Sequence, residues 1–479
     1  MLECRTSNPS LEREYCMKRR HNKSISLFAN YIFLAFHSFV FAWIWFEQYN
    51  PALSIPYKRH GSYLLIFLFF LCLFSCNQIF GGFRLGYYKV LDSIIARSLS
   101  LIITYAVSYL IISLMFYGFT FFIPMLIAIL IGILFNIIWT KFSSFIYYQL
   151  NPPRQMLLIY GDSPIEEIYT KISSRSEKYE IVKCIHYTIG EENLKQEIIR
   201  HEAVILYDLS ANLRNQLIKY CYEYSVRVYV TPKLYDILIR GASEMDLFDT
   251  PFLLMRNRQL TLFQAFTKRT FDILVASLGL IITTPLILII LFCMKIFDHG
   301  PILYRQTRLT LNGKEFQIIK FRSMYPDAEK NSIRLMSKQD DRITPIGRIL
   351  RRTHLDELPQ LLNILKGDMS FVGPRPERPE ITAVYSAEIP EFSYRLKMKA
   401  GLTGYAQVYG KYNSTPYDKL KLDLIYIQNY SLLLDIKLLF LTGKTLFIPG
   451  HVEGINNNFE TALRKQIAVT IEEEKIRKK

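Results

Sequence analysis

The apolar stretch Ile273–Met294, ILVASLGLIITTPLILIILFCM, decides how the second half of the chain meets a membrane. It is long enough to cross a hydrocarbon core as one helix, and that would carry everything after it to the far side. Pro285 lies in its middle, where proline removes a backbone hydrogen bond and bends a helix. Basic residues flank it, with Lys268 before and Lys295 after. The residues alone leave two alternatives open: a fifth transmembrane helix, or a hairpin that enters the membrane and returns.

Residues 1–150 are predicted to form a membrane domain. Four apolar runs of roughly 20 residues are each long enough to cross a bilayer; they occupy 27–46, 62–80, 94–117 and 119–140. Basic residues within 18–23 precede the first run, so the positive-inside bias places the N-terminus in the cytoplasm. The polar leading segment has no apolar core of a cleavable signal peptide. Four crossings return the chain to the cytoplasm, and we expect this domain to be an anchor.

Composition and charge narrow the class of partner. The chain has 479 residues, 50% of them hydrophobic, and its 58 Lys and Arg against 42 Asp and Glu give a net charge of +16. This length predicts more than one domain. The positive charge favours an anionic partner, and the apolar content favours a membrane surface or a phosphorylated substrate over nucleic acid. The seven cysteines form no C-x-x-C pair, so we expect neither a disulfide framework nor a cysteine metal site.

Alternating strand-like and helical runs over 151–258 predict a Rossmann-like α/β domain with a mostly parallel sheet. The strand-like runs are 156–160, 180–187, 203–207 and 226–230. Dinucleotide-binding sheets carry G-x-G-x-x-G after the first strand, whereas this chain has GDSP at 161–164. Without the other glycines the backbone cannot approach a pyrophosphate closely, so we expect no bound nicotinamide cofactor.

Charge, glycine and proline are densest over 301–449, around the string RILRRTHLDELPQLLN at 348–363. Pro359 suits the first turn of a helix and Gly367 its C-terminal stop, which predicts Asp356 at or near the N-cap. Asp and Glu are favoured at that place for structural reasons alone. A purely structural role for Asp356 and Glu357 therefore remains one alternative, and His354 beside them is predicted to be structural.

The surrounding cations favour phosphate chemistry for the pair. Helix N-termini attract phosphate, and guanidinium groups bind phosphate oxygens bidentately. A carboxylate there can attack phosphorus to form an acyl phosphate, or hold Mg2+ against phosphate oxygens, and two adjacent carboxylates can divide these tasks. The candidate substrate-binding residues are Arg305, Arg308, Lys320, Arg322, Arg348, Arg351, Arg375 and, on a flexible loop over 401–407, Gln407.

At these residues the chain resembles the monotopic phosphoglycosyl transferases, the bacterial sugar transferases that initiate glycan assembly on polyprenyl phosphate. The resemblance covers about 266–449, and its domain order is similar to that of the large members that start capsule, O-antigen or exopolysaccharide synthesis. The ordered motifs are KRxFD at 268–272, the apolar stretch broken at Pro285, KFRSM at 320–324, LDELPQ at 355–360, KGDMS at 366–370, GPRP at 373–376 and GLTGxAQ at 401–407. Two positions depart from the family pattern: Thr284-Pro285 replaces a common Ser-Pro, and Lys411 stands where an arginine often follows the glycine.

The resemblance implies a reaction. Asp356 would attack the phosphorus next to the sugar of a UDP-sugar, release UMP and carry a phosphosugar that undecaprenyl phosphate then takes. Glu357 would bind Mg2+, and Arg375 would contact the nucleotide sugar. The motifs identify neither the sugar nor the polysaccharide pathway.

The resemblance also implies an architecture. It favours a re-entrant helix over 270–294 within a catalytic domain of 266–450, on the cytoplasmic face of the bacterial inner membrane, with a charged tail over 451–479. The predicted fold class is a membrane α-helical bundle, a Rossmann-like α/β domain and a monotopic α+β catalytic domain with that re-entrant membrane helix. The membrane domain is compatible with a homodimer.

Two other functions remain as alternatives. A membrane-bound nucleotide-sugar dehydratase or epimerase also pairs four spans with a Rossmann domain, but it needs the missing glycine fingerprint and a helical Tyr-x-x-x-Lys. That spelling occurs at 179–183 and 229–233, in strand-like runs. A membrane scaffold for assembly enzymes would carry 266–449 as an inactive domain. The intact Asp356-Glu357 pair and Arg375 argue against it, because nothing structural requires that set together.

Overall fold

A computed structural model of the chain describes residues 9–247, 249–255, 260–298, 300–325, 342–410 and 415–446. The chain divides into two compact units, Met1–Pro232 and Lys233–Lys479. The charged tail predicted over 451–479 lies outside the described residues, and so does Lys411.

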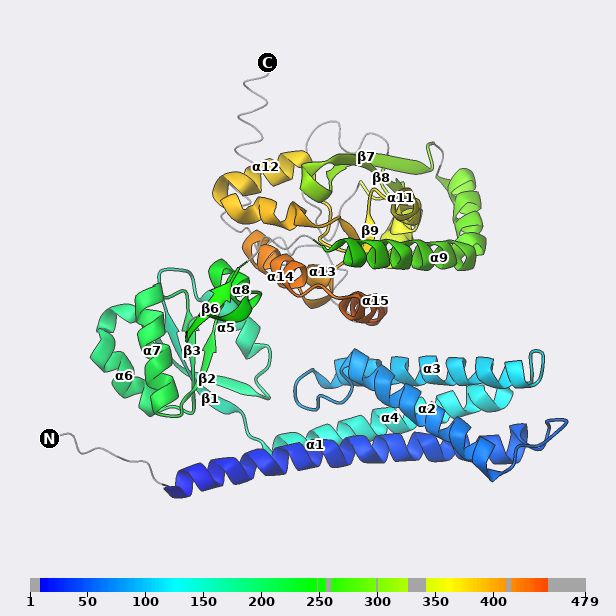
Figure 1. Ribbon diagram of the computed structural model, residues 1–479, viewed down its shortest axis with the longest axis horizontal. Helices are drawn as coiled ribbons and strands as arrows, with labels where there is room; N and C mark the ends of the chain where they lie inside the picture. Colours follow the sequence, from blue (N-terminus) through cyan, green and yellow to red (C-terminus); the bar gives the residue numbers. More distant parts are fainter. Residues whose placement is uncertain are drawn as a thin grey trace, which may run out of the picture. The chain divides into compact units, whose positions relative to one another are not determined.

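Four long helices open the first unit (Figure 1): α1 (Pro9–Ile44), α2 (Arg59–Phe80), α3 (Val90–Met115) and α4 (Ile123–Leu150). A π-helical turn, η1 (Trp45–Tyr49), extends α1. Each helix contains a segment long and apolar enough to cross a membrane, in agreement with the four predicted runs. Aromatic side chains fill the centre of the bundle, where Phe41 stacks on Phe69 with ring centroids 4.2 Å apart. Many outward Leu, Ile and Phe side chains are exposed, as a lipid-facing surface requires.

Arg97 is a fully buried cation inside this bundle. Its guanidinium donates to the Gly82 backbone oxygen at 3.0 Å, to Thr140 Oγ1 at 3.0 Å and to Asn30 Oδ1 at 2.7 Å. Polar groups in such an interior need internal partners. Arg97 therefore ties α3 to α1, to α4 and to the α2–α3 connection.

An all-parallel sheet of order β2-β1-β3-β4 follows the bundle, as the strand–helix alternation predicted. Its strands are β1 (Arg154–Tyr160), β2 (Tyr179–His186), β3 (Ala203–Tyr207) and β4 (Arg227–Val230), and its helices are α5 (Glu166–Ser173), α6 (Glu191–Ile199) and α7 (Ala211–Glu223), with a short turn η2 (Tyr187–Ile189). Side chains of α6 and α7 pack on one face and those of α5 on the other. Burial on both faces explains why β1 and β3 read as continuous apolar runs. A Cβ at Gly161 would lie 2.0 Å from the Asp208 backbone oxygen, so this glycine permits a close approach between strand ends.

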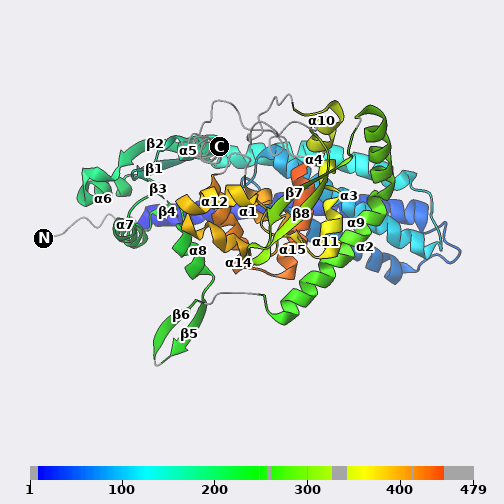
Figure 2. The same cartoon turned by 90° about the horizontal axis from the view of Figure 1, so that it is seen from above.

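The second unit begins with α8 (Leu234–Arg240), ahead of the domain boundary predicted at 258, because α8 packs against α14. An antiparallel hairpin, β5 (Ser243–Leu247) with β6 (Thr250–Leu254), comes next and extends away from α8 in Figure 2. The remaining elements are α9 (Leu262–Phe297), β7 (Leu303–Leu309), η3 (Leu311–Gly313), β8 (Glu315–Phe321), α10 (Pro345–Arg352), η4 (Leu355–Glu357), α11 (Gln360–Lys366), β9 (Ser370–Val372), α12 (Pro379–Glu388), η5 (Pro390–Lys397), β10 (Gly401–Thr403), α13 (Tyr405–Tyr409), α14 (Pro416–Gln428) and α15 (Leu432–Leu446). β7 pairs antiparallel with β8, and β9 pairs parallel with β10.

α9 is continuous over 36 residues and contains Pro285. The helix is bent rather than straight in both views (Figures 1 and 2). The chain therefore passes Pro285 without the complete break that the sequence suggested. Two side-chain hydroxyls accompany the bend, since Thr283 and Thr284 donate to the backbone oxygens of Gly279 and Leu280. Proline and such back-bonded threonines are recognised causes of helix bending.

Both arms of α9 pack on the same body of the second unit. Before the proline, Ala276 joins a buried cluster with Ile318 of β8 and residues of α11. After it, Ile290 and Met294 pack with Phe321 of β8 and with residues of α10. The two arms therefore both pack against β8.

The KRxFD motif anchors the first arm. Lys268 is buried and donates to Asp435 Oδ2 at 2.6 Å and to the Val372 backbone oxygen at 2.9 Å. Asp272 accepts from Ser370 Oγ at 3.0 Å and from the Phe371 backbone at 2.8 Å. These contacts join α9 to β9 and α15, which gives both motif residues a structural role.

Candidate active site

The chain around Asp356 forms a separate turn ahead of α11. His354 is exposed and adopts a left-handed conformation (φ 57°), and Asp356 then lies in the short turn η4. α11 begins at Gln360, four residues after Asp356, with Pro359 as its N-cap, and Gly367 (φ 96°) ends it as predicted. Asp356 was predicted at or near the N-cap of this helix; it lies three residues before the N-cap, Pro359, and does not cap the helix. Helix capping therefore does not account for the Asp356-Glu357 pair.

Glu357 is held between two cations. Its Oε1 accepts from Lys320 Nζ at 2.9 Å and from Arg375 Nη2 at 2.8 Å. The Glu357 side chain is 12% exposed, and that of Arg375 is 47% exposed. β8 supplies Lys320, and the segment after β9 supplies Arg375, so three separated stretches of sequence meet at one carboxylate.

Asp356 is buried beside this cluster, but no described residue donates a hydrogen bond to its carboxylate. Burial raises its pKa, and the charge of Glu357 raises it further, against the opposing charges of Lys320 and Arg351. Burial also raises the pKa of Glu357, but Arg375 and Lys320 outweigh that effect and hold it well below its usual range. Paired groups whose pKa values are pushed apart are typical of sites that assign different roles to two carboxylates.

The sequence over most of the second unit matches known proteins. The profile of the family described as "Bacterial sugar transferase" matches residues 263–449. A UDP-glucose:undecaprenyl-phosphate glucose-1-phosphate transferase of Caulobacter vibrioides is 42% identical over 184 residues, 37% of this chain and 69% of the relative. An exopolysaccharide production protein of Rhizobium leguminosarum is 39% identical over 182 residues, 36% of this chain and 91% of the relative. This chain belongs to the bacterial sugar transferase family.

Other members of the family match over a smaller part of their length. A UDP-N-acetylgalactosamine-undecaprenyl-phosphate N-acetylgalactosaminephosphotransferase of Aeromonas hydrophila is 38% identical over 185 residues, 38% of this chain and 44% of that protein. The chain thus spans less than half the length of several relatives that it matches. Their names include different sugars, glucose and N-acetylgalactosamine.

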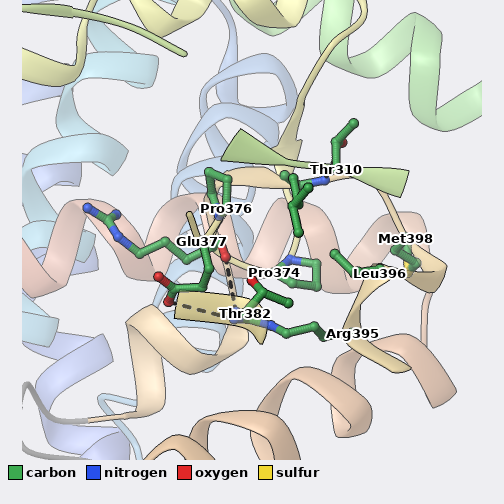
Figure 3. Close-up of a pocket in the computed structure, with 11 residues that line it drawn as sticks. Thr310, Pro374, Pro376, Glu377, Thr382, Arg395, Leu396 and Met398 are labelled. Atoms are coloured by element: carbon green, nitrogen blue, oxygen red, sulfur yellow. Dashed lines mark hydrogen bonds and ion pairs between the residues drawn. The ribbon is translucent and has the colours of Figure 1, made fainter. Parts of the chain in front are cut away.

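In this sugar transferase a second arginine fixes the backbone beside Arg375. Arg395 is buried and donates through Nη2 to the Arg375 backbone oxygen at 3.0 Å. Its Nε donates to Asp423 Oδ2 at 3.0 Å, and its Nη1 lies 3.6 Å from Glu377. Figure 3 shows Arg395 and Glu377 pointing toward each other at a small pocket that Pro374 and Pro376 also line. The Arg395–Asp423 pair therefore determines the path of the Pro-Arg-Pro segment.

Asp423→Ala is expected to destabilise the second unit by roughly 3–5 kcal/mol, because it leaves Arg395 buried without its carboxylate partner. Asp418→Ala on the same helix is the matched control, since Asp418 pairs with Lys421 at a 36% exposed position. We expect that control to cost less than about 1 kcal/mol. Unfolding of the purified full chain measures both, and equal losses in the two variants would contradict a buried ion pair at 423.

Two predicted binding residues lie beside the site without contacting Glu357. Arg308 donates to the Pro376 backbone oxygen at 3.1 Å and so supports the Pro-Arg-Pro segment. Arg351 donates to Ser323 Oγ at 2.7 Å, and its charge acts on Asp356. Arg351 therefore borders Asp356, whereas Arg308 supports the segment that carries Arg375.

The other predicted binding residues are placed differently. Arg322 is buried, donates to the Asp298 backbone oxygen and lies 3.6 Å from the Asp298 carboxylate, so it secures the chain just after α9. Arg305 and Arg348 are exposed on β7 and α10. Gln407 donates to the Leu402 backbone oxygen at 3.0 Å, which fixes it within its own loop.

The glycine motif over 401–407 is a close-packed crossing and not the flexible loop that the sequence suggested. Cβ atoms at Gly401 and Gly404 would each lie 2.1 Å from backbone atoms of Gly373. The Thr403 and Thr442 hydroxyls meet at 2.5 Å. Glycine is needed here because two backbones touch, and the contact sets the start of the Pro-Arg-Pro segment.

Sequence reasoning missed Arg395 and Asp423. One signal was present, since Asp423 shares the apolar face of α14 with Leu420, Leu424 and Ile427. A carboxylate on such a face needs a buried partner. No pattern in the sequence identified Arg395 as that partner.

Proposed function

We propose that this chain transfers a sugar 1-phosphate from a UDP-sugar to undecaprenyl phosphate, releases UMP and so initiates synthesis of a capsule, O-antigen or exopolysaccharide. The observation that carries the proposal is the buried Asp356 carboxylate, to which none of the described residues donates a hydrogen bond, next to Glu357 between Lys320 and Arg375. The names of the relatives support a UDP-sugar donor and an undecaprenyl phosphate acceptor.

Asp356 acts as the nucleophile in this proposal. A carboxylate oxygen attacks the phosphorus next to the sugar, and the bond from that phosphorus to UMP breaks, with the electron pair leaving on UMP. An oxygen of undecaprenyl phosphate then attacks the same phosphorus, and the Asp356 carboxylate leaves. The raised pKa of Asp356 makes its carboxylate more basic than an ordinary one, which favours nucleophilic attack.

Lys320 and Arg375 supply positive charge where a diphosphate would lie. Arg375 is the more exposed of the two and can donate from another edge of its guanidinium to phosphate oxygens while it holds Glu357. Preorganised cations of this kind stabilise charge that develops on a leaving phosphate. Arg395 keeps the Arg375 backbone in place during both transfers.

Glu357 is our candidate ligand for Mg2+. Both of its hydrogen bonds fall on Oε1, and the described residues contain no group of three or more His, Cys, Asp or Glu that could hold a metal. Mg2+ is commonly bound by one or two carboxylates together with substrate phosphates, and the adjacent pair fits that pattern. Bound there, the ion would neutralise charge on the diphosphate.

A panel of UDP-sugars with undecaprenyl phosphate, assayed for UMP release, tests the function and identifies the sugar. We expect one donor to be clearly preferred. Absence of UMP release from every donor by the purified full chain would contradict the proposal.

α9 is proposed to be a re-entrant helix that enters the membrane and returns to the same face. Only 11% of the apolar stretch of α9 is buried within the protein, so most of that stretch is available to lipid. Both arms also pack on the body that carries Lys320 and Glu357. A straight crossing of about 30 Å would pull these arms apart or draw the charged site into hydrocarbon. With four preceding spans, the site then faces the cytoplasm of the inner membrane, and the parallel sheet of 154–230 is a Rossmann-like domain on the same side.

Cysteine labelling tests this topology. In a cysteine-free background, Arg305→Cys is expected to resist an impermeant external reagent, whereas Tyr117→Cys in the exposed α3–α4 turn should be labelled. Pro285→Leu restores the missing N–H and favours a straight helix by roughly 3 kcal/mol. We expect Pro285→Leu to lower activity and to make position 305 accessible to the external reagent in a fraction of the molecules. External labelling at 305 in the chain with Pro285 intact would refute the re-entrant helix.

A further inference from the structure

A group of cations lies at one edge of the parallel sheet, where the chain enters the sheet from the membrane domain. Its members, here called the basic edge, are Arg154, Arg175, Lys178 and Arg227. Arg154 opens β1 and Arg227 opens β4, while Arg175 and Lys178 precede β2. Because the strands are parallel, their N-terminal ends meet at one edge.

The basic edge lies close to the end of the last membrane helix. Only three residues separate the end of α4 at Leu150 from Arg154, so that arginine stays within about 14 Å of the membrane helix. Arg175 donates to the Tyr87 backbone oxygen at 2.9 Å, and Lys178 Nζ lies 5.0 Å from the centre of the Tyr87 ring. Tyr87 belongs to the α2–α3 connection, which is on the same side of the bundle as the end of α4, and tyrosine is typical of that interface.

The cations of the basic edge exceed its carboxylates. Glu177 pairs with Arg175 at 2.6 Å, and Glu202 is exposed just before β3. Arg175 Nη2 is shielded from solvent, and none of the described residues meets the geometry of a hydrogen bond with it, although the Arg175 side chain also acts on Tyr148. Burial lowers the pKa of Lys178 to about 8, and the charges of Arg175, Arg154 and Arg227 contribute to that shift. An anion among these groups would relieve their repulsion.

We propose that the basic edge binds the phosphate of an anionic glycerophospholipid headgroup and so holds the α/β domain against the bilayer. Clusters of Lys and Arg immediately beside a transmembrane helix are suited to anionic lipid. The guanidinium groups supply bidentate contacts to phosphate oxygens, and Lys178 supplies a point charge. This role is separate from the transfer reaction, since it uses residues of the first unit alone.

Native mass spectrometry of the purified full chain, titrated with short-chain phosphatidylglycerol or phosphatidylcholine, tests the proposal. We expect clear preference for phosphatidylglycerol, and loss of roughly thirtyfold in its affinity in Arg175→Gln/Lys178→Gln, from removal of two cations near the headgroup. The matched control is Lys183→Gln/Arg200→Gln, which removes two cations that both pair with Glu197, at 2.9 Å and 3.0 Å. The control variant should bind phosphatidylglycerol with unchanged affinity. Arg227→Gln alone, with a smaller loss, provides a second variant if the double variant fails to fold.

Three results would overturn the proposal. Equal retention of the two lipids would remove the preference for an anion, and unchanged binding in the double and Arg227 variants would place the lipid elsewhere. Displacement of phosphatidylglycerol by an equal concentration of inorganic phosphate would identify a free-anion site instead. UMP release of the double variant, measured in parallel, separates this outcome from any failure of the proposed transferase activity.

Discussion

Asp356→Asn is expected to reduce UMP release by at least about 10⁴-fold, because an amide cannot form the acyl phosphate bond. The folded state of this variant should be as stable as that of the unaltered protein, or slightly more stable. The carboxylate accepts no hydrogen bond from the described residues, and its burial beside Glu357 opposes its charge. The raised pKa shows that these effects outweigh the attraction of Lys320 and Arg351, so removal of the charge should not destabilise the folded state.

The matched control for this variant is Asp418→Asn, an equal change of charge at a partly exposed aspartate that pairs with Lys421. Steady-state UMP release and thermal unfolding of the full chain are measured for both. Near-normal turnover by Asp356→Asn would refute the role of Asp356 as nucleophile. An equal loss of turnover in both variants would show a general defect of the second unit.

Glu357→Gln is expected to reduce turnover by roughly 10²- to 10³-fold and to raise the Mg2+ concentration needed for activity. The amide loses the negative charge that balances Lys320 and Arg375 and weakens a ligand for the metal. Excess chelator should stop UMP release by the unaltered protein. Undiminished turnover in chelator would contradict the metal requirement. A lower rate in Glu357→Gln without a change in Mg2+ dependence would show that Glu357 positions the two cations and does not bind the metal.

The same variant has a consequence for stability. Because the pKa of Glu357 is lower in the folded chain than its ordinary value, its contribution is fully present above that ordinary value and is lost as pH falls toward the folded pKa. The stability difference between the unaltered protein and Glu357→Gln should therefore be constant near neutral pH and shrink in acid. Unfolding curves at several pH values measure this, and a difference that grows in acid would contradict the sign of the shift.

Local patterns in the sequence predicted much of the fold. The four apolar runs correspond to α1–α4, and the strand-like run at 203–207 coincides with β3. Gly367 ends α11 as a left-handed residue. These features depend on neighbouring residues only, through span length, burial on both faces of a strand, and backbone freedom.

Contacts between distant segments account for what the sequence did not predict. Arg322 stands in a basic motif beside Lys320, yet Lys320 reaches Glu357 while Arg322 turns to Asp298. Residues two apart on an extended strand face the same side, but β8 ends at Phe321, so Arg322 lies beyond the strand and takes another direction. The motif itself does not show where the strand ends. Arg395 and Asp423 meet across 28 residues, so neither segment alone reveals the pair.

The nucleophile itself is tested most directly by isolating the intermediate. The full chain is incubated with its UDP-sugar in the absence of undecaprenyl phosphate, quenched in acid, digested and analysed by mass spectrometry. We predict about one UMP released for each chain and one phosphosugar on the peptide that contains Asp356, with none in Asp356→Asn. UMP release that occurs only when undecaprenyl phosphate is present, without any such adduct, would contradict the two-step transfer and its aspartate nucleophile.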